Sequence, residues 1–183
     1  MTTQFDPSQV VWEGWHFLAG DGCLRYPPHT KVEPGQTLTA VGPLVLCENG
    51  LHASRKPIDA LLYSPPSKQI LICRVRLDGE IIEESDKAVS RRRLCVWMGD
   101  ATAVLHEFAC WCAEAALALI AHPDPRSAEA IAVKRRWLLG LATDKELAAA
   151  RAAAWAAGAV ARAAREAAAR AAAWAAGAVA RGA

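Results

Sequence analysis

Short apolar runs with prolines beside them dominate the first half of the chain. The runs cover residues 10–18, 23–26, 37–41, 44–47, 69–77 and 80–84, and eight of the ten prolines lie before residue 98. Such runs, separated by tight loops, are typical of β-strands. The pattern therefore predicts a β-rich domain over residues 1–98.

The stretch 69–84 has the clearest alternation of apolar and polar positions in this domain. Its odd-numbered positions predict a buried face, and its even-numbered positions a partly wet one. Asp78-Gly79 predicts a hairpin turn that joins two strands here. A short helix is expected over residues 55–63, with Ser54 as its N-cap and Pro57 in its first turn. The expected buried face consists of Leu71, Cys73, Val75 and Leu77.

After residue 99 the apolar spacing changes to that of helices. Asp100 can cap a helix over residues 101–121, and Asp124 with Pro125 begins a second one that Gly140 can end. Thr143 and Glu146 form a capping box, so a third helix begins there. The first helix is expected to bury Val104, Leu105, Phe108, Cys112, Ala115 and Leu119.

The tail from 144 to 183 is rich in alanine and contains a repeat. Alanine occupies 23 of the 36 residues from 148 to 183, and the sequence ARAAAWAAGAVAR begins at both Ala150 and Ala169. One helix from 144 to 181 would be about 57 Å long. We favour a break or an antiparallel helix pair near 162–168 over one continuous helix, and the sequence leaves both open. The smooth alanine face lets another helix approach closely, so we expect a homo-oligomer through these helices.

Composition narrows the class of protein. The net charge of +2 is too small for the protein as a whole to attract nucleic acid electrostatically. The six cysteines form no C-x-x-C pair, so we expect reduced, buried thiols and no metal site. The start lacks the pattern of a signal peptide, and arginines interrupt the alanine-rich tail. The expectation is an α+β protein of the cytoplasm that does not contact a membrane: a small twisted antiparallel β lobe, 1–98, followed by a helical region, 99–183.

Two segments resemble known families. LCENGLHA, which fits C-x-x-G-[LF]-H-A, and the proline-started helix and strand after it resemble a small uncharacterised domain of bacteriophage and prophage proteins. The region from LHEFACWCAEAAL through HPDPRSAEAIAVKRRWLLG and the alanine-rich tail is similar to helical putative immunity proteins. Neither resemblance implies a reaction. Together they imply a phage or mobile element in conflict with a bacterial host.

The segment 46–63 allows a catalytic and a structural interpretation. Cys47, His52 and Asp59 are the residue types of a nucleophile, a base and an orienting acid. In the structural interpretation, which we favour, residues 48–50 form a turn and His52 bonds the loop backbone.

A second catalytic hypothesis comes from a resemblance in outline to ADP-ribosyltransferase-like folds, which use NAD. The matching residues are His16, Tyr26, Ser54 and the segment from Ala60 to Tyr63. The chain lacks the [Q/E]-x-E pair of those folds, so Glu80, Glu83, Glu84 or Glu107 would have to supply the acid. Without that acid, the transfer step lacks the group that steers the ribose.

The basic run after residue 86 is the best candidate for a contact surface. Arginine binds carboxylate and phosphate through a two-pronged contact, and arginine with tryptophan is common at the centres of protein interfaces. The alternative is that the run pairs with the acidic segment before it. The candidate partner-binding residues are Lys87, Arg91, Arg92, Arg93 and Trp97.

The sequence therefore favours a non-enzymatic interaction protein without a cofactor. It would bind a host or toxin macromolecule, such as a host defence protein or a nucleoprotein complex, as a defence inhibitor or immunity protein does. The NAD-dependent transferase is the alternative, and it requires a site that gathers His16, Ser54 and an acid.

Overall fold

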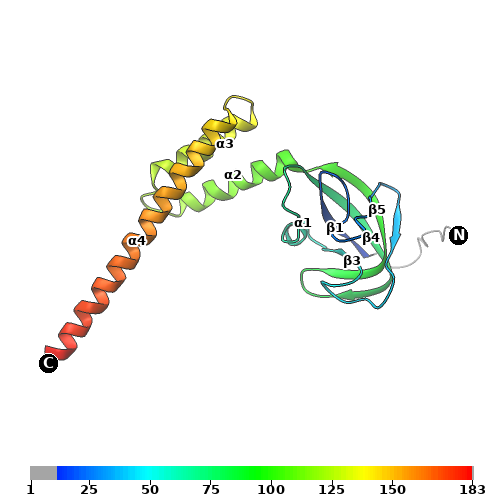
Figure 1. Ribbon diagram of the computed structural model, residues 1–183, viewed down its shortest axis with the longest axis horizontal. Helices are drawn as coiled ribbons and strands as arrows, with labels where there is room; N and C mark the ends of the chain where they lie inside the picture. Colours follow the sequence, from blue (N-terminus) through cyan, green and yellow to red (C-terminus); the bar gives the residue numbers. More distant parts are fainter. Residues whose placement is uncertain (1–11, 183) are drawn as a thin grey trace. The chain divides into compact units, whose positions relative to one another are not determined.

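The computed structural model describes residues 12–182, with side chains for most residues up to 170 (Figure 1). Five antiparallel strands with one short helix are followed by three longer helices, so the protein is of the α+β class. The chain divides into two compact units, Met1–Thr102 and Ala103–Ala183, called here the β unit and the helical unit. The predicted boundary after residue 98 falls inside the last strand.

The β unit is built around a long hairpin. Its strands are β1 (Trp12–Ala19), β2 (Thr37–Thr39), β3 (Leu51–Ala53), β4 (Ile70–Glu83) and β5 (Ala88–Asp100), and α1 (Pro57–Leu61) lies between β3 and β4. The order in the sheet is β1-β4-β5-β2, and β3 also pairs with β5. Every pairing is antiparallel.

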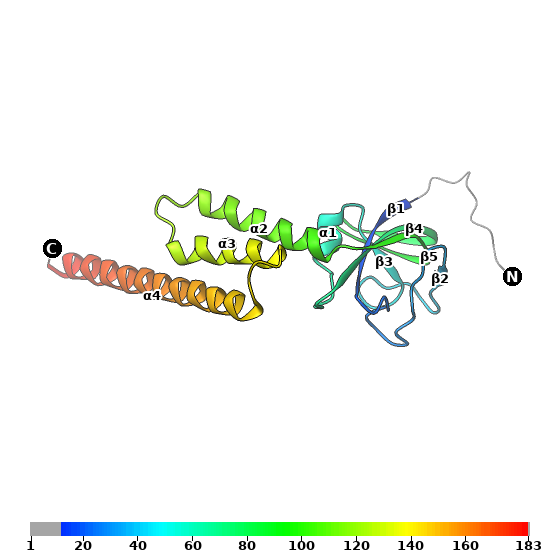
Figure 2. The same ribbon diagram turned by 90° about the horizontal axis from the view of Figure 1, so that it is seen from above.

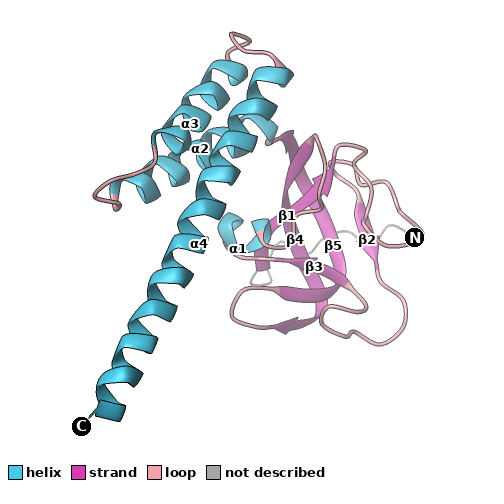
Figure 3. Cartoon of the chain, turned by 60° about the vertical axis from the view of Figure 1, so that its left-hand side comes forward, coloured by secondary structure: helices cyan, strands magenta, loops and turns pink. Residues whose placement is uncertain are grey.

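The sheet curls until its first strand meets its third. Trp15 of β1 and Ser54, directly after β3, exchange backbone hydrogen bonds of 2.7 and 3.0 Å. The strands β1, β4, β5 and β3 therefore form a ring around an interior, as in a small barrel. Figure 3 shows the strong curvature of β4 and β5 that this closure needs.

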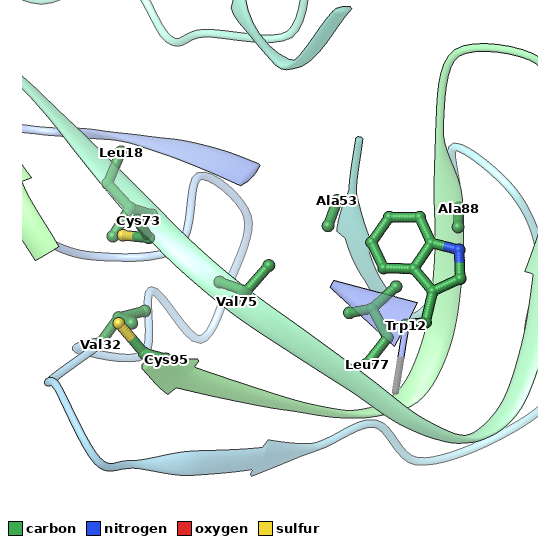
Figure 4. Close-up of a cluster of buried hydrophobic side chains, with 9 residues drawn as sticks. All are labelled: Trp12, Leu18, Val32, Ala53, Cys73, Val75, Leu77, Ala88 and Cys95. Atoms are coloured by element: carbon green, nitrogen blue, oxygen red, sulfur yellow. The ribbon is translucent and has the colours of Figure 1, made fainter. Parts of the chain in front are cut away.

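Side chains from all of these strands fill the interior. The expected inner face of β4 is confirmed, because Cys73, Val75 and Leu77 are buried and Leu71 packs against the same cluster. Figure 4 shows this apolar cluster, which also contains Trp12, Leu18, Val32, Ala53, Ala88 and Cys95.

The hairpin predicted at Asp78-Gly79 is wrong. The chain continues through this dipeptide as one strand, and Gly79 with Glu80 lies opposite Arg91 alone in a β-bulge. Gly79 has a φ of +76°, which suits both a turn and a bulge. What distinguishes a bulge from a turn here is that β5 pairs with β4 on both sides of Gly79. The true turn follows at residues 84–87, where Glu84 N–H donates to the Lys87 carbonyl.

Several other strand predictions also need correction. Residues 23–26 and 44–47 form only isolated bridges, through Cys23 and Val45. The strands β3 and β5 were not predicted. In β3 the run of apolar residues is too short to signal a strand. The charges of β5 had suggested a solvated surface.

The helical unit comprises α2 (Thr102–Ala118), α3 (Pro125–Leu138) and α4 (Asp144–Gly182). The predicted caps are confirmed: Asp100 accepts from Thr102 N–H and Asp124 from Arg126 N–H, and Gly140 follows α3 with a φ of +72°. The capping box of α4 is also present, since the Thr143 and Glu146 side chains bond each other's backbone N–H groups.

The break predicted in the tail is wrong. Figure 2 shows α4 as one continuous helix, and it extends to Gly182. Alanine has the highest helix propensity, and each of the two glycines inside the repeat lowers it by only about 1 kcal/mol. A long helix also offsets its nucleation penalty better than two short ones.

Candidate functional site

His52 organises the loop before β3. Its Nε2 accepts a hydrogen bond of 2.9 Å from the Cys47 backbone N–H. Burial, together with the charge of Arg93, lowers the pKa of His52, while a bond to the Gly50 backbone opposes this shift. The imidazole ring is therefore uncharged near neutral pH, and it forms hydrogen bonds with the backbone of the loop. The predicted bond between His52 and the loop backbone is therefore confirmed, with the Cys47 N–H as its donor.

Ser54 has a different role from the one predicted. It is only 2% exposed, and its backbone closes the ring of strands at Trp15. The N-cap of α1 is Lys56, and no side chain caps that helix. The prediction that Ser54 caps the helix is therefore wrong, whereas Pro57 does begin it.

The four residues of the transferase hypothesis are spread over different environments. His16 lies in β1, next to the residue that pairs with Ser54, so these two are near neighbours. Tyr26 is 68% exposed and lies outside the named strands. Glu107 belongs to α2 of the helical unit, where it pairs with Arg135 at 2.6 Å. The β unit thus places His16 and Ser54 at neighbouring positions along the chain pairing. Its own candidate acids, Glu80, Glu83 and Glu84, pair with Arg91, Arg55 and Lys87.

The basic run predicted to bind a partner forms most of β5 and is largely paired within the chain. Arg91 bonds Glu80 at 2.8 Å, and Arg92 bonds Asp78. Both acids lie on β4, directly across the hairpin. The alternative interpretation, pairing with the acidic segment, is confirmed for these two arginines.

The prediction that Arg93 contacts a partner is wrong. It is 3% exposed, because alternation along β5 places it on the inner face, opposite Leu77. Of the other two members of the run, Lys87 is half-buried and Trp97 is exposed. Lys87 interacts with Glu84 at 3.4 Å and with the Tyr63 ring, and its hydrogen bond to the Tyr63 hydroxyl raises its pKa. Trp97 is 51% exposed.

The interior of the β unit holds a polar cluster that the sequence did not reveal. It consists of His16, Arg93, Cys73 and Cys95. Burial lowers the pKa of Arg93 to about 10 and, with the charge of Arg93, lowers the pKa of His16 well below its usual value. A hydrogen bond from Cys73 to Cys95 raises the pKa of Cys73. The only sequence signal was the i, i+2 spacing of Arg93 and Cys95, which places both on one face.

The helical unit exposes the face of α2 that its periodicity predicts to be buried. Phe108 and Trp111 stack with ring centroids 6.0 Å apart and an interplanar angle of 19°. Trp111 is 61% exposed, and Val104 and Leu119 are exposed as well. Cys112 and Ala115, on the same face, are also exposed. The predicted burial of this face is therefore wrong, except at Leu105, which is half-buried. We call Val104, Phe108, Trp111, Cys112 and Ala115, with Leu119 directly after the helix, the outer face of α2.

The opposite side of α2 contacts α3. Arg135 of α3 bonds both carboxylate oxygens of Glu114, at 2.7 and 2.8 Å, and also bonds Glu107. His106 meets the Trp137 ring edge-on at 5.6 Å. These contacts fix which face of α2 turns inward, and they leave the outer face without a cover among the described residues of its own unit.

Comparison with known proteins identifies a similar family, and no biochemical activity is known for that family. Residues 22–107 match the model of a family described as a domain of unknown function (DUF7666), which makes most of the β unit and the start of α2 similar to that family. No curated protein and no solved structure matches the chain.

Two further findings concern the part of the chain that the structure describes. It contains no group of three or more His, Cys, Asp or Glu side chains placed to hold a metal ion. None of its helices combines the length and the hydropathy that a membrane span requires.

Proposed function

We propose that this is a non-enzymatic interaction protein of a phage or mobile element, which binds a host or toxin macromolecule through its helical unit. The observation that carries the proposal is the outer face of α2. Its aromatic pair, Phe108 and Trp111, is stacked and exposed. Aromatic side chains provide most of the binding energy at many protein interfaces.

The small core of the helical unit supports the same conclusion. Among the described residues of α2, α3 and α4, the buried ones are Cys110, Val133, Leu147 and Ala157. Meanwhile Phe108, Trp111 and Leu119 all lie at the surface. A helix with an apolar stripe at helical spacing buries that stripe in a stable assembly. A partner that covers α2 would supply the missing burial.

The proposed partner is a protein with an apolar groove. An amphipathic helix places residues at i, i+4, i+7 and i+11 into such a groove, and Val104, Phe108, Trp111 and Ala115 have this spacing. The ion pairs of Glu107 and Glu114 with Arg135 lie towards α3, so they do not interrupt the apolar stripe. The setting of host and mobile element comes from the two resemblances described above.

The experiment compares three forms of the full-length tagged protein: the wild type, Phe108→Glu with Trp111→Glu, and a control with the same added charge. The control is Ala152→Glu with Ala159→Glu, two exposed residues on the side of α4 that faces away from α3. Circular dichroism first establishes that all three are folded.

We expect the wild type and the control to capture the same bacterial protein, and the α2 variant to lose it. Calorimetry with that purified partner then gives a weaker affinity for the α2 variant alone. Equal binding by all three forms would refute the proposal, as would the absence of any partner of the wild type.

A further inference from the structure

Arg93 carries its charge into the interior of the β unit. It projects from β5 and reaches β3, where Nη1 donates to the carbonyl oxygen of His52. Directly after β3, Ser54 is bridged to Trp15 of β1. The guanidinium head therefore lies near the seam between β3 and β1, where His16 follows Trp15.

The charge of Arg93 has no counterion among the described residues. Its neighbours Arg91 and Arg92 each bond a carboxylate of β4, whereas the contact of Arg93 is with a carbonyl oxygen. Its second terminal nitrogen, Nη2, is buried and has no hydrogen-bond partner. A guanidinium offers five N–H donors and stays protonated near neutral pH. A buried charge left without a partner is strongly destabilising.

The nearby thiols do not supply the missing negative charge. Cys73 keeps its proton, because its hydrogen bond to Cys95 raises its pKa. A hydrogen bond from Cys73 and the charge of Arg93 lower the pKa of Cys95. The Cys95 sulfur, however, donates to the Trp97 carbonyl oxygen at 3.6 Å. A thiolate at this place would face the partial negative charge of that oxygen, so the contact favours the protonated thiol. Both sulfurs belong to the apolar cluster of Figure 4.

His16 offers a second polar group beside Arg93. Its place opposite Cys73 puts it on the inner face of β1. The charge of Arg93 acts on its ring and, with burial, keeps it neutral. A neutral imidazole carries one donor and one acceptor nitrogen. The ring of His52, in contrast, is already engaged with the loop backbone.

We infer that the interior of the β unit is a binding site for a small oxyanion, held by the guanidinium of Arg93 and the imidazole of His16. A phosphate or carboxylate group matches the fork of a guanidinium and accepts two parallel N–H bonds. It would satisfy Nη2 and neutralise the buried charge. This site is independent of the proposed protein interface on α2.

The test titrates the full-length protein with inorganic phosphate and, separately, with acetate, at neutral pH and at an ionic strength held constant with sodium chloride. The readouts are calorimetry and NMR of the arginine side-chain N–H groups. We expect one of the two anions to bind and to shift the resonance of Arg93. The anion that binds identifies the group that the site accepts.

Three variants identify the residues of the site. Arg93→Met keeps much of the volume and removes the charge, so we expect it to lose at least about tenfold in affinity, as for other charge-assisted bonds. His16→Gln should weaken binding less. The control Arg91→Met removes an arginine from the same strand, one that is paired with Glu80, and should leave the affinity unchanged.

The basal stability gives a second criterion. Since an unpaired buried charge is removed, Arg93→Met without ligand should melt at the wild-type temperature or above it. Two results would overturn the inference: that the wild type binds neither anion at millimolar concentration, or that it shows the ultraviolet absorbance of a thiolate that Cys95→Ala abolishes. The second result would make Cys95 the counterion of Arg93.

Discussion

At the scale of single residues, Gly50 shows how closely the loop before β3 fits the core. Its φ of +128° is in a region that only glycine adopts readily. A Cβ at this position would collide with the Val89 side chain and lie 2.9 Å from Leu44 Cδ2. Both the backbone and the space therefore require glycine here.

We expect Gly50→Ala to lower the free energy of unfolding of the β unit by about 2–4 kcal/mol, through backbone strain and overpacking together. Urea denaturation measures this loss. Gly35 is the matched control, because its φ is +83° and a Cβ there would meet nothing within 4 Å. Gly35→Ala should lose only about 1 kcal/mol. Equal losses in the two variants would show that the fit around Gly50 does not matter.

The buried histidines predict a dependence of stability on pH. Burial and the charge of Arg93 lower the pKa of both His16 and His52 in the folded state, and Lys87 adds to the effect on His52. The unfolded state then binds more protons below about pH 6.5. Stability is therefore full above that pH and decreases as the pH falls, by up to about 1.4 kcal/mol per pH unit for each histidine.

Urea midpoints measured between about pH 7 and 5.5, where most carboxylates stay ionised, should show this decrease. His16→Gln should reduce the slope. An unchanged slope in this variant would mean that His16 is protonated in the folded protein.

At the scale of elements, the capping box of α4 is a local device with a measurable contribution. Thr143 Oγ1 accepts from Glu146 N–H at 3.2 Å, and the Glu146 side chain accepts from Thr143 N–H at 2.7 Å. The bonds that the Glu146 carboxylate accepts from the backbone N–H and the hydroxyl of Thr143 also lower the pKa of Glu146. The two bonds from backbone N–H satisfy two of the N–H groups that a helix leaves unpaired at its start.

We expect Thr143→Ala to destabilise the helical unit by about 1 kcal/mol. Thermal unfolding followed by far-ultraviolet circular dichroism measures the change. Lys145→Ala, at an exposed position in the same turn, is the control and should change stability by less than about 0.5 kcal/mol. If both variants lost the same amount of stability, the loss in Thr143→Ala could not be attributed to the cap.

At the scale of the whole molecule, the two units differ in how much apolar surface they bury. The β unit contains a cluster of nine buried residues from all parts of its chain. The described residues of the three long helices bury only four side chains. Since burial of apolar surface is the main favourable contribution to folding, the helical unit should be the less stable one.

Hydrogen exchange followed by mass spectrometry at increasing urea should therefore show two transitions, with α2, α3 and α4 opening first. Gly50→Ala should move only the transition of the β unit, and Thr143→Ala only that of the helical unit. A single transition that both variants shift equally would contradict the division into two units.

The sequence by itself determined the features that depend on neighbours along the chain. The caps at Asp100, Asp124 and Thr143, the end of α3 at Gly140 and the inner face of β4 all follow from contacts a few residues apart. Their physical basis is local hydrogen bonding and the fixed periods of helix and strand.

Only the tertiary structure decided the features that depend on distant partners. Asp78-Gly79 is a bulge because β5 pairs on both sides of it, and Arg91 is bound because Glu80 lies across the hairpin. The side chain of Arg93 points inward because the pairing of β5 with β4 places Arg93 opposite Leu77, on the inner face. The outer face of α2 is exposed although its spacing predicts burial. Periodicity identifies an apolar face, but only the packed molecule determines whether anything covers it.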